Sequence, residues 1–373
     1  MRILSWRVFI VLVLNMCLCV LLIRQYSHYY GPTDSVADPI YAEPFFVRSN
    51  ISPAHIAQLP NLSHLEWPPV QVADKPAGVR LIDETGPVQP LPKVFEPVMS
   101  RGQRELCKHL LRLFSNLMFE NGYGDKFMLY GGTLIGSYRH HDLIPWDDDM
   151  DLLVEAEIRP RVQALLEALS PKYHLTKQRD RDKFHTVVSP VFSVNETDAL
   201  VSRRSSDYSW GWPYLDIGYY WENATHIGEI GSSYGRTYEW PKQIVLPLRF
   251  RPLGTEWYPT PYRTLEFLRL IYGTDQQCAV YGYSHVLEGG GPSGKTFCEN
   301  LAIRYPFVEH RPVTKSQTHK IITPPFVRDK FVLGVERLIV RDVVGHGHVL
   351  HTLQMPMLEQ ETRSETYGFG ERS

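Results

Sequence analysis

Closely spaced carboxylates stand out between residues 144 and 152, where the chain reads IPWDDDMDL. If a strand begins here, Asp147, Asp149 and Asp151 alternate onto one face and Asp148 points to the other. Neighbouring carboxylates repel each other, and a hard divalent cation such as Mg²⁺ or Mn²⁺ relieves that repulsion while leaving coordination positions for phosphate oxygens. We therefore expect Asp149 and Asp151 to be metal ligands, with a solvated acidic turn as the alternative.

A third carboxylate would complete such a site, because two-metal clamps in phosphate chemistry bring several acidic ligands together. Asp216 lies between apolar residues in the segment YLDI, residues 214–217, where an unpaired carboxylate would be costly to bury. We expect Asp216 to lie on a neighbouring strand and to bind metal together with Asp149 and Asp151.

A glycine pair upstream, in the segment GGTLIGSYRH of residues 131–140, could bind an anion. The backbone N–H groups of Gly131, Gly132 and Thr133 would open a helix whose N-terminus attracts phosphate, and Arg139 could add a cationic contact. We expect these residues to bind the phosphate groups of a donor. The same pattern also suits a plain tight turn followed by a surface arginine.

The elements that would position these residues alternate between strands and helices, which predicts an α/β (α+β) fold with a mixed sheet. A capping box of Ser100 and Gln103 opens an amphipathic helix that Gly122 ends. Thr260 and Pro261 are expected to start another helix, which Gly273 ends. The other predicted elements are strands at residues 127–130, 149–154, 186–194 and 214–220 and helices at 133–139 and 158–169.

Taken together, GGTLIG at residues 131–136, Arg139-His140 and IPWDDDMDL closely resemble the core motif of the LicD family. That family includes bacterial phosphorylcholine transferases and animal fukutin-type ribitol-phosphate transferases. Further on, LPL at residues 246–248 and a helix ending in Tyr272-Gly273 look like its distal signature, so the resemblance covers about residues 100–275. Residues 137–138 replace the small pair that often precedes the arginine, which could reshape the donor pocket.

The resemblance implies a nucleotidyltransferase-like mixed sheet flanked by helices and an active site that depends on Mg²⁺ or Mn²⁺. It also implies a CDP-linked donor whose group, of the phosphocholine or ribitol phosphate type, moves to a glycan or glycoprotein hydroxyl while CMP leaves. Carried onto this chain, Asp149, Asp151 and Asp216 match the metal-binding acids. Asp147 matches the acid after the family's tryptophan and would support the ligands or activate the acceptor.

An uncharged apolar run at residues 8–23, flanked by Arg7 and Arg24, predicts a signal anchor. As a helix it would span about 24 Å, which suits a thin early-secretory bilayer. A cleaved signal peptide is the alternative, but the small residues that cleavage requires do not follow the run. We expect a single-pass type II protein of the Golgi or ER with its catalytic domain in the lumen.

This interpretation divides the chain into five parts. They are a cytosolic tail (1–7), the anchor (8–23), a proline-rich luminal stem without a core (24–99), a LicD-like catalytic domain (100–305) and a partly mobile C-terminal extension (306–373).

Four Asn-x-Ser/Thr triplets fit a luminal body, and they begin at Asn50, Asn61, Asn195 and Asn223. Asn50 is the weakest acceptor because Pro53 follows its triplet.

The cysteines also fit a luminal compartment, and the net charge bears on the kind of partner. In an oxidising lumen we expect Cys278 and Cys298 to form a disulfide and Cys107 to remain a buried thiol. A net charge of -2, from 39 basic and 41 acidic residues, argues against a nucleic-acid partner.

Two other functions compete with this prediction. Residues 289–296, GGGPSGKT, fit the P-loop pattern and would suit a Golgi sulfotransferase that uses Lys295, although the preceding residues are mixed and polar. A non-catalytic subunit that keeps the family fold to bind glycans is the second, which the intact acids disfavour. A cluster of His346, His348 and His351 could bind a metal or lie on the surface.

Overall fold

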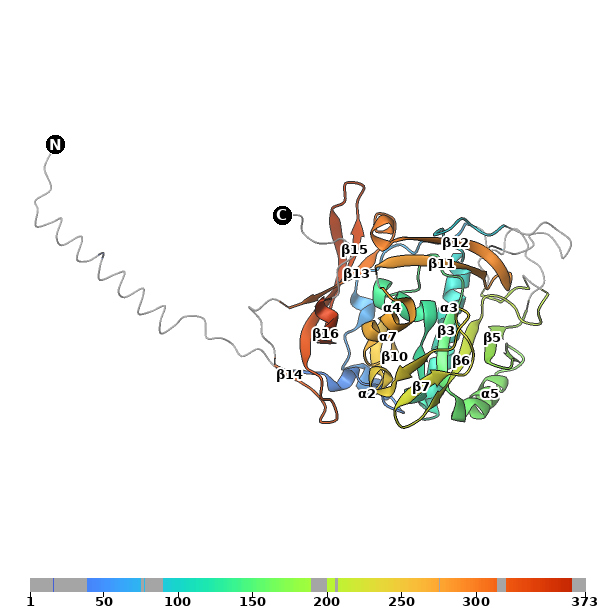
Figure 1. Ribbon diagram of the computed structural model, residues 1–373, viewed down its shortest axis with the longest axis horizontal. Coiled ribbons are helices and arrows are strands. Elements are labelled where there is room, and N and C mark those ends of the chain that lie inside the picture. The colour runs from blue at the N-terminus through green and yellow to red at the C-terminus, as the bar shows by residue number, and fades with distance from the viewer. Residues whose placement is uncertain are drawn as a thin grey trace, which may run out of the picture.

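Figure 1 shows the computed structural model of the chain, which describes residue 16 and residues 39–74, 77, 90–188, 200–204, 207–274, 276–313 and 320–363. Among these residues, no helix is long and apolar enough to cross a membrane. The predicted anchor at residues 8–23, apart from Met16, and the sequon at Asn195 lie outside the described residues, so both stay predictions.

A seven-stranded mixed sheet forms the centre of the fold, with the strand order β2-β3-β6-β5-β4 and with β7 and β8 added beside β6. β3 and β6 run parallel, and the other neighbouring pairs run antiparallel. The strands are β2 (Phe127–Leu129), β3 (Met150–Glu155), β4 (Tyr173–Lys177), β5 (Arg181–Thr186), β6 (Leu215–Glu222), β7 (His226–Glu229) and β8 (Glu239–Pro241). The mixed α/β sheet predicted from the sequence is confirmed.

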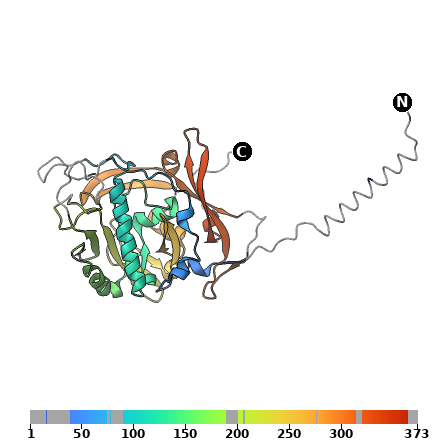
Figure 2. The same cartoon turned by 180° about the vertical axis from the view of Figure 1, so that it is seen from behind.

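Helix α3 (Arg101–Glu120) crosses one face of the sheet, with α5 (Arg159–Glu167) beside it (Figure 2). The predicted capping box is confirmed, because the Ser100 N–H donates to Gln103 Oε1 at 2.8 Å and the Gln103 N–H donates to Ser100 Oγ at 3.4 Å. Such a cap stabilises a helix by about 1 kcal/mol. The apolar stripe of α3 packs into the main core, where Leu110 and Phe114 are fully buried.

Helix α4 (Gly131–His140) packs against β3 and also contacts α7 (Thr264–Tyr272). Short helices lie at Pro53–Ile56 (α2) and Lys242–Val245 (α6). Single 3-10 turns lie at Glu43–Phe45, Leu62–His64, Gly124–Lys126, Ala156–Ile158, Cys298–Leu301 and Glu361–Arg363.

Two predicted elements are displaced in the structure. The strand expected at residues 186–194 begins earlier, as β5, and residues 189–194 lie outside the described part. The helix expected from Pro261 begins at Thr264, because residues 256–260 are still paired in a strand and the Thr264 hydroxyl then donates to the Pro261 carbonyl. Its end at Gly273, where φ is +78°, is as predicted.

Strands β11 (Gln277–Ser284) and β12 (Gly289–Phe297) form a hairpin that runs over one end of the central sheet (Figure 1). A disulfide between Cys278 and Cys298 joins the base of this hairpin, where the two Cα atoms are 5.0 Å apart. The P-loop-like residues 289–296 therefore lie in an antiparallel strand and not in a loop that leads into a helix. That interpretation of the motif is wrong, and the sulfotransferase alternative loses its basis.

The described N-terminal residues pack onto the domain, although we expected a stem without a core. Strand β1 (Ile40–Tyr41) pairs with β14 (Ile321–Ile322), and Phe45 is buried against Trp257 of the hairpin formed by β9 (Arg249–Leu253) and β10 (Glu256–Thr260). The apolar side chains between the prolines fill a second core, which includes Leu59 and Leu62. The stem prediction is wrong for these residues because prolines exclude regular pairing but not burial.

The C-terminal residues also form part of the fold. Strands β13 (Phe307–Pro312), β15 (Phe331–Arg341) and β16 (Gly347–Leu358) make a three-stranded antiparallel sheet against α4 and β9. Fully buried Glu336 of this sheet accepts from His141 Nε2 at 2.7 Å and from Arg251 Nη2 at 2.7 Å. The described part of the extension, which we expected to be partly mobile, is therefore fixed to the body of the domain by a buried ion pair and a buried hydrogen bond.

Candidate active site

A cavity of about 720 Å³ opens where β3 and β6 begin, beneath the β11–β12 hairpin. All four predicted acids, Asp147, Asp149, Asp151 and Asp216, line it. Its walls come from the hairpin, from residues 232–235 and from residues 91–98, which we had assigned to the stem. Segments that precede and follow the motif region in the sequence therefore help to form the cavity.

Strand register explains why the carboxylates converge. Asp151 and Asp216 are direct partners on the two parallel strands, so their side chains leave the sheet side by side. Asp149 precedes β3, and ligand atoms of Asp149, Asp151 and Asp216 all lie within 4.8 Å of one another. The structure thus brings together the three residues predicted as metal ligands, whereas metal binding itself stays a prediction.

The glycine pair allows these acids to approach helix α4. A Cβ atom on Gly131 would lie 2.2 Å from Asp151 Oδ2, and one on Gly132 would lie 2.1 Å from Asp147 Oδ2. Gly131 also has a φ of +55°, which disfavours any side chain. The N-terminus of α4 therefore faces carboxylates of the cluster.

The residues predicted to bind donor phosphate do not lie together in the structure. Thr133 is buried, and its hydroxyl accepts from the Asp151 N–H at 2.8 Å, which fixes the start of β3. Gly132 and Arg139 line the cavity, but about 12 Å of helix axis separates Arg139 from the start of α4. The Arg139 guanidinium instead lies 3.4 Å from Cys298 Sγ at the base of the hairpin. These residues do not form the single anion site that we expected.

Two cations that the sequence prediction missed line the cavity beside the acids. Arg181 and Lys183 are two residues apart on β5 and share a face. Arg181 Nη1 lies 3.4 Å from Asp151 Oδ1 and 3.6 Å from Asp216 Oδ2, and Lys183 Nζ lies 3.7 Å from Asp216 Oδ2. Their alternation in RDKFHT was the available signal, but the strand had been placed after it.

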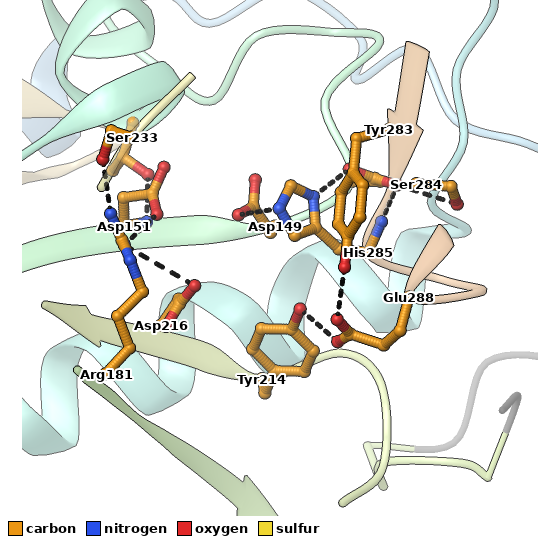
Figure 3. A network of polar contacts seen from close by, with 12 residues as sticks. Asp149, Asp151, Arg181, Tyr214, Asp216, Ser233, Tyr283, Ser284, His285 and Glu288 are labelled. Atoms are coloured by element: carbon orange, nitrogen blue, oxygen red, sulfur yellow. Dashed lines mark hydrogen bonds and ion pairs between the residues drawn. The ribbon is translucent and has the colours of Figure 1, made fainter. Parts of the chain in front are cut away.

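Asp148 and His285 also belong to the site, as Figure 3 shows for His285 and its neighbours. We had expected Asp148 to point away, but residues before Met150 are not in the strand, so the alternation rule does not apply. Asp148 Oδ1 accepts from His285 Nδ1 at 2.8 Å, and His285 Nε2 lies 3.2 Å from Asp149 Oδ2. A neighbouring hairpin residue, Glu288, accepts from Tyr214 and lies 3.4 Å from Lys183 Nζ.

Electrostatics favour a cation among the acids. Desolvation, reinforced by the neighbouring carboxylates, raises the pKa of Asp147 to about 7 and holds that of Asp151 well above its usual range. Desolvation likewise raises the pKa of Asp149 to about 8, with His285 opposing it. Buried Asp216 Oδ1 has no hydrogen-bond partner among the described residues. An arrangement of clustered carboxylates with an unsatisfied oxygen fits a divalent cation such as Mg²⁺ or Mn²⁺.

Other predicted features lie away from the cavity. The side chains of Asn50, Asn61 and Asn223 are exposed, as acceptors of N-glycans must be, and their use stays a prediction. Cys107 is a buried free thiol on α3.

The predicted histidine cluster is divided in the structure. His351 is buried, and its Nε2 lies 2.9 Å from His141 Nδ1, whereas His346 and His348 are exposed beside Asp342. These three residues therefore do not share one metal site.

The region that contains the motifs is similar to known proteins. Residues 124–263 match the family model described as "LicD/FKTN/FKRP, nucleotidyltransferase domain". Over 57 residues the chain is 40% identical to the lipopolysaccharide cholinephosphotransferase LicD of Haemophilus influenzae, a match that covers 15% of this chain and 21% of that protein. The chain thus aligns with about a fifth of the length of this curated relative.

A solved structure, the lincosamide antibiotic adenylyltransferase LnuA with bound lincomycin, aligns with 48% of this chain and 89% of its own. The sequence identity is 14% and the TM-score is 0.26.

Proposed function

Because residues 124–263 place the chain in the LicD family, as its motifs predicted, we propose that it is a metal-dependent phosphotransferase. It moves a phospho-alcohol group, of the phosphocholine or ribitol phosphate type, from a CDP-linked donor to a glycan or glycoprotein hydroxyl and releases CMP.

One observation carries this proposal. Asp149, Asp151 and Asp216 converge to within 4.8 Å in the lining of the cavity, where Arg181 and Lys183 of β5 lie beside them. A site that joins clustered acids to nearby cations suits a ligand that combines divalent metal with phosphate, because each partner neutralises the other's charge.

The three acids would hold Mg²⁺ or Mn²⁺, which when bound neutralises charge on the phosphate oxygens. Arg181 and Lys183 are close enough to the acids to donate hydrogen bonds to a phosphate group placed between them. The cavity walls would orient the donor, and positioning together with charge stabilisation supplies most of the rate enhancement in phosphoryl transfer.

Asp147 has a different role in this proposal. It lines the cavity and lies against the start of α4 at Gly132, next to the predicted metal ligands, where a carboxylate can reach the hydroxyl of a bound acceptor. We assign it to accepting the proton of the attacking hydroxyl.

The cellular setting is part of the proposal. The apolar segment at residues 8–23 would anchor the chain in the Golgi or ER membrane with its domain in the lumen. A disulfide at the base of the hairpin and exposed sequons at Asn61 and Asn223 support an oxidising, glycosylating compartment.

The test uses the full chain in detergent with a panel of CDP-linked donors, Mg²⁺ or Mn²⁺, and a mixture of glycans as acceptors, and it follows CMP release. Asp149→Asn is expected to abolish turnover while folding and secretion stay intact. Asp342→Asn, in the exposed turn between β15 and β16, is the matched control and should keep wild-type turnover.

Normal turnover in Asp149→Asn would refute the metal assignment. A wild-type chain that releases no CMP from any donor but binds glycans would favour the non-catalytic alternative.

A further inference from the structure

His285 reaches the acid cluster from outside the motif region. It lies in the turn between β11 and β12, and Figure 3 shows its ring extending from this hairpin to Asp149. The Nε2 atom is 3.2 Å from Asp149 Oδ2, and ligand atoms of Asp148, Asp149 and His285 all lie within 4.8 Å of one another. A second group of possible metal ligands therefore adjoins the first and shares Asp149 with it.

The orientation of the ring is fixed. Asp148 Oδ1 accepts from Nδ1 at 2.8 Å, and Asp148 Oδ2 accepts from the His285 backbone N–H at 2.9 Å. When Nδ1 carries the proton, the lone pair of Nε2 points toward Asp149. A histidine that donates one ring N–H to a carboxylate and presents the other nitrogen is the usual arrangement around protein-bound metals.

The surrounding structure holds the hairpin in this position. Glu288, three residues after His285, accepts from Trp210 Nε1 at 2.8 Å and from the Tyr214 hydroxyl at 2.6 Å. The disulfide joins the other end of the hairpin. His285 is thus preorganised at the cavity, and little side-chain entropy remains to be lost when it binds a ligand.

An unsatisfied oxygen marks the place for a cation. Asp149 is 4% exposed, and its Oδ2 accepts no hydrogen bond among the described residues, although it lies within ion-pair distance of His285. A cation between Nε2 and this oxygen would satisfy both atoms.

We propose that His285 Nε2 and Asp149 bind a second divalent cation, which Asp149 bridges to the cation of the Asp151–Asp216 side, while Asp148 orients the imidazole. This inference rests on the proposed function, because phosphate oxygens of the donor would complete the coordination. A nitrogen ligand disfavours Mg²⁺, which prefers oxygen, so the second position selects a first-row transition ion such as Mn²⁺.

The experiment measures nitrogen coordination directly. Full-length protein in detergent is loaded with Mn²⁺, and pulsed electron paramagnetic resonance detects ¹⁴N nuclei bound to the metal. We expect ¹⁴N modulation in the wild type, its replacement by a ¹⁵N pattern when histidine is ¹⁵N-labelled, and its loss in His285→Gln. His226→Gln, at a half-exposed site on β7, is the matched control and should keep the signal.

Asp148→Asn tests the positioning role. It is expected to weaken binding of this Mn²⁺ by about 10- to 100-fold, as loss of a carboxylate behind a metal-bound histidine does, and to change Mg²⁺ binding little. Equal weakening of Mn²⁺ and Mg²⁺ would contradict a nitrogen-selective position.

The outcomes separate this inference from the proposed function. Bound Mn²⁺ without ¹⁴N modulation in the wild type overturns the second site and leaves the carboxylate site intact. ¹⁴N modulation in a protein that releases no CMP from any CDP-linked donor upholds the second site and overturns the proposed reaction. Failure of Mn²⁺ to bind at all overturns both. The isotope comparison needs no substitution and shows whether any histidine binds the metal, and Asp148→Asn, which keeps His285 in place, reports on this histidine even if His285→Gln does not fold.

Discussion

Replacing Gly132 by alanine should separate activity from stability. The added Cβ would lie 2.1 Å from Asp147 Oδ2 and 3.1 Å from its Cγ, so the carboxylate must shift by more than about 1 Å to reach ordinary van der Waals separation. Gly132 has no positive φ, and therefore its backbone accepts alanine without strain. Only the position of one acid at the cavity floor changes.

The two expected magnitudes differ widely. Replacing glycine by alanine at a compatible backbone conformation stabilises a protein by about 0.4 to 1 kcal/mol, which offsets the displacement of the carboxylate. The free energy of unfolding should therefore change by less than about 1 kcal/mol. Turnover should fall by about 100-fold, because a misplacement of about 1 Å at a catalytic group has that effect.

Denaturant unfolding and CMP release, measured on the same preparation, test both magnitudes. Gly290→Ala is the control, because an added Cβ there meets nothing within 4 Å in the β11–β12 hairpin, and it should leave both quantities unchanged. Turnover of Gly132→Ala within about twofold of the wild type would refute the argument that the lack of a side chain at Gly132 lets Asp147 take its catalytic position.

Three further substitutions test other parts of the structure. Phe45→Ala should lower the free energy of unfolding by about 3 to 5 kcal/mol in denaturant titrations, because Phe45 is buried against Trp257; no change would indicate a free stem. Burial lowers the pKa of His141 to about 4. Because the unfolded chain then binds more protons than the folded chain between pH 6.5 and 4, the free energy of unfolding should fall by up to about 3 kcal/mol as the pH falls through this range. His141→Asn, which tolerates the left-handed φ of 53°, should reduce that slope in unfolding measured against pH, and an unchanged slope would contradict the assignment. Lys183→Gln should raise the KM for the donor by about 10- to 100-fold with little change in kcat, because a charge-assisted hydrogen bond contributes about 1.5 to 3 kcal/mol; an unchanged KM would remove Lys183 from phosphate binding.

Local sequence patterns were sufficient to predict that Asp151 and Asp216 lie on strands and that α3 begins after Ser100. Alternation and apolar flanks identified Asp151 and Asp216 because a strand repeats every two residues, and the capping box of Ser100 and Gln103 marked the helix start. These signals are contained within a few residues of the chain, so sequence alone can show them.

Contacts between segments that are distant in the sequence could not be predicted from local patterns. Nothing near His285 indicates that its hairpin folds over residues 148–149, more than a hundred positions earlier, because tertiary packing alone decides that approach. The glycine-rich β12 resembled a loop by composition, yet pairing with β11 satisfies its backbone groups. The buried apolar residues around Phe45 were hidden by the prolines between them.

Glu336 has a consequence for truncated forms of this protein. A premature stop codon after residue 263 would retain every residue of the family match but would remove this carboxylate from beneath α4. Arg251 would lose its counter-ion together with the sheet that covers it, and the loss of α7 would remove Leu265, Phe267 and Ile271 from the main core. Late nonsense alleles should therefore behave as complete losses, and a gene product that ends at the boundary of the recognised motif should be degraded before it reaches any substrate.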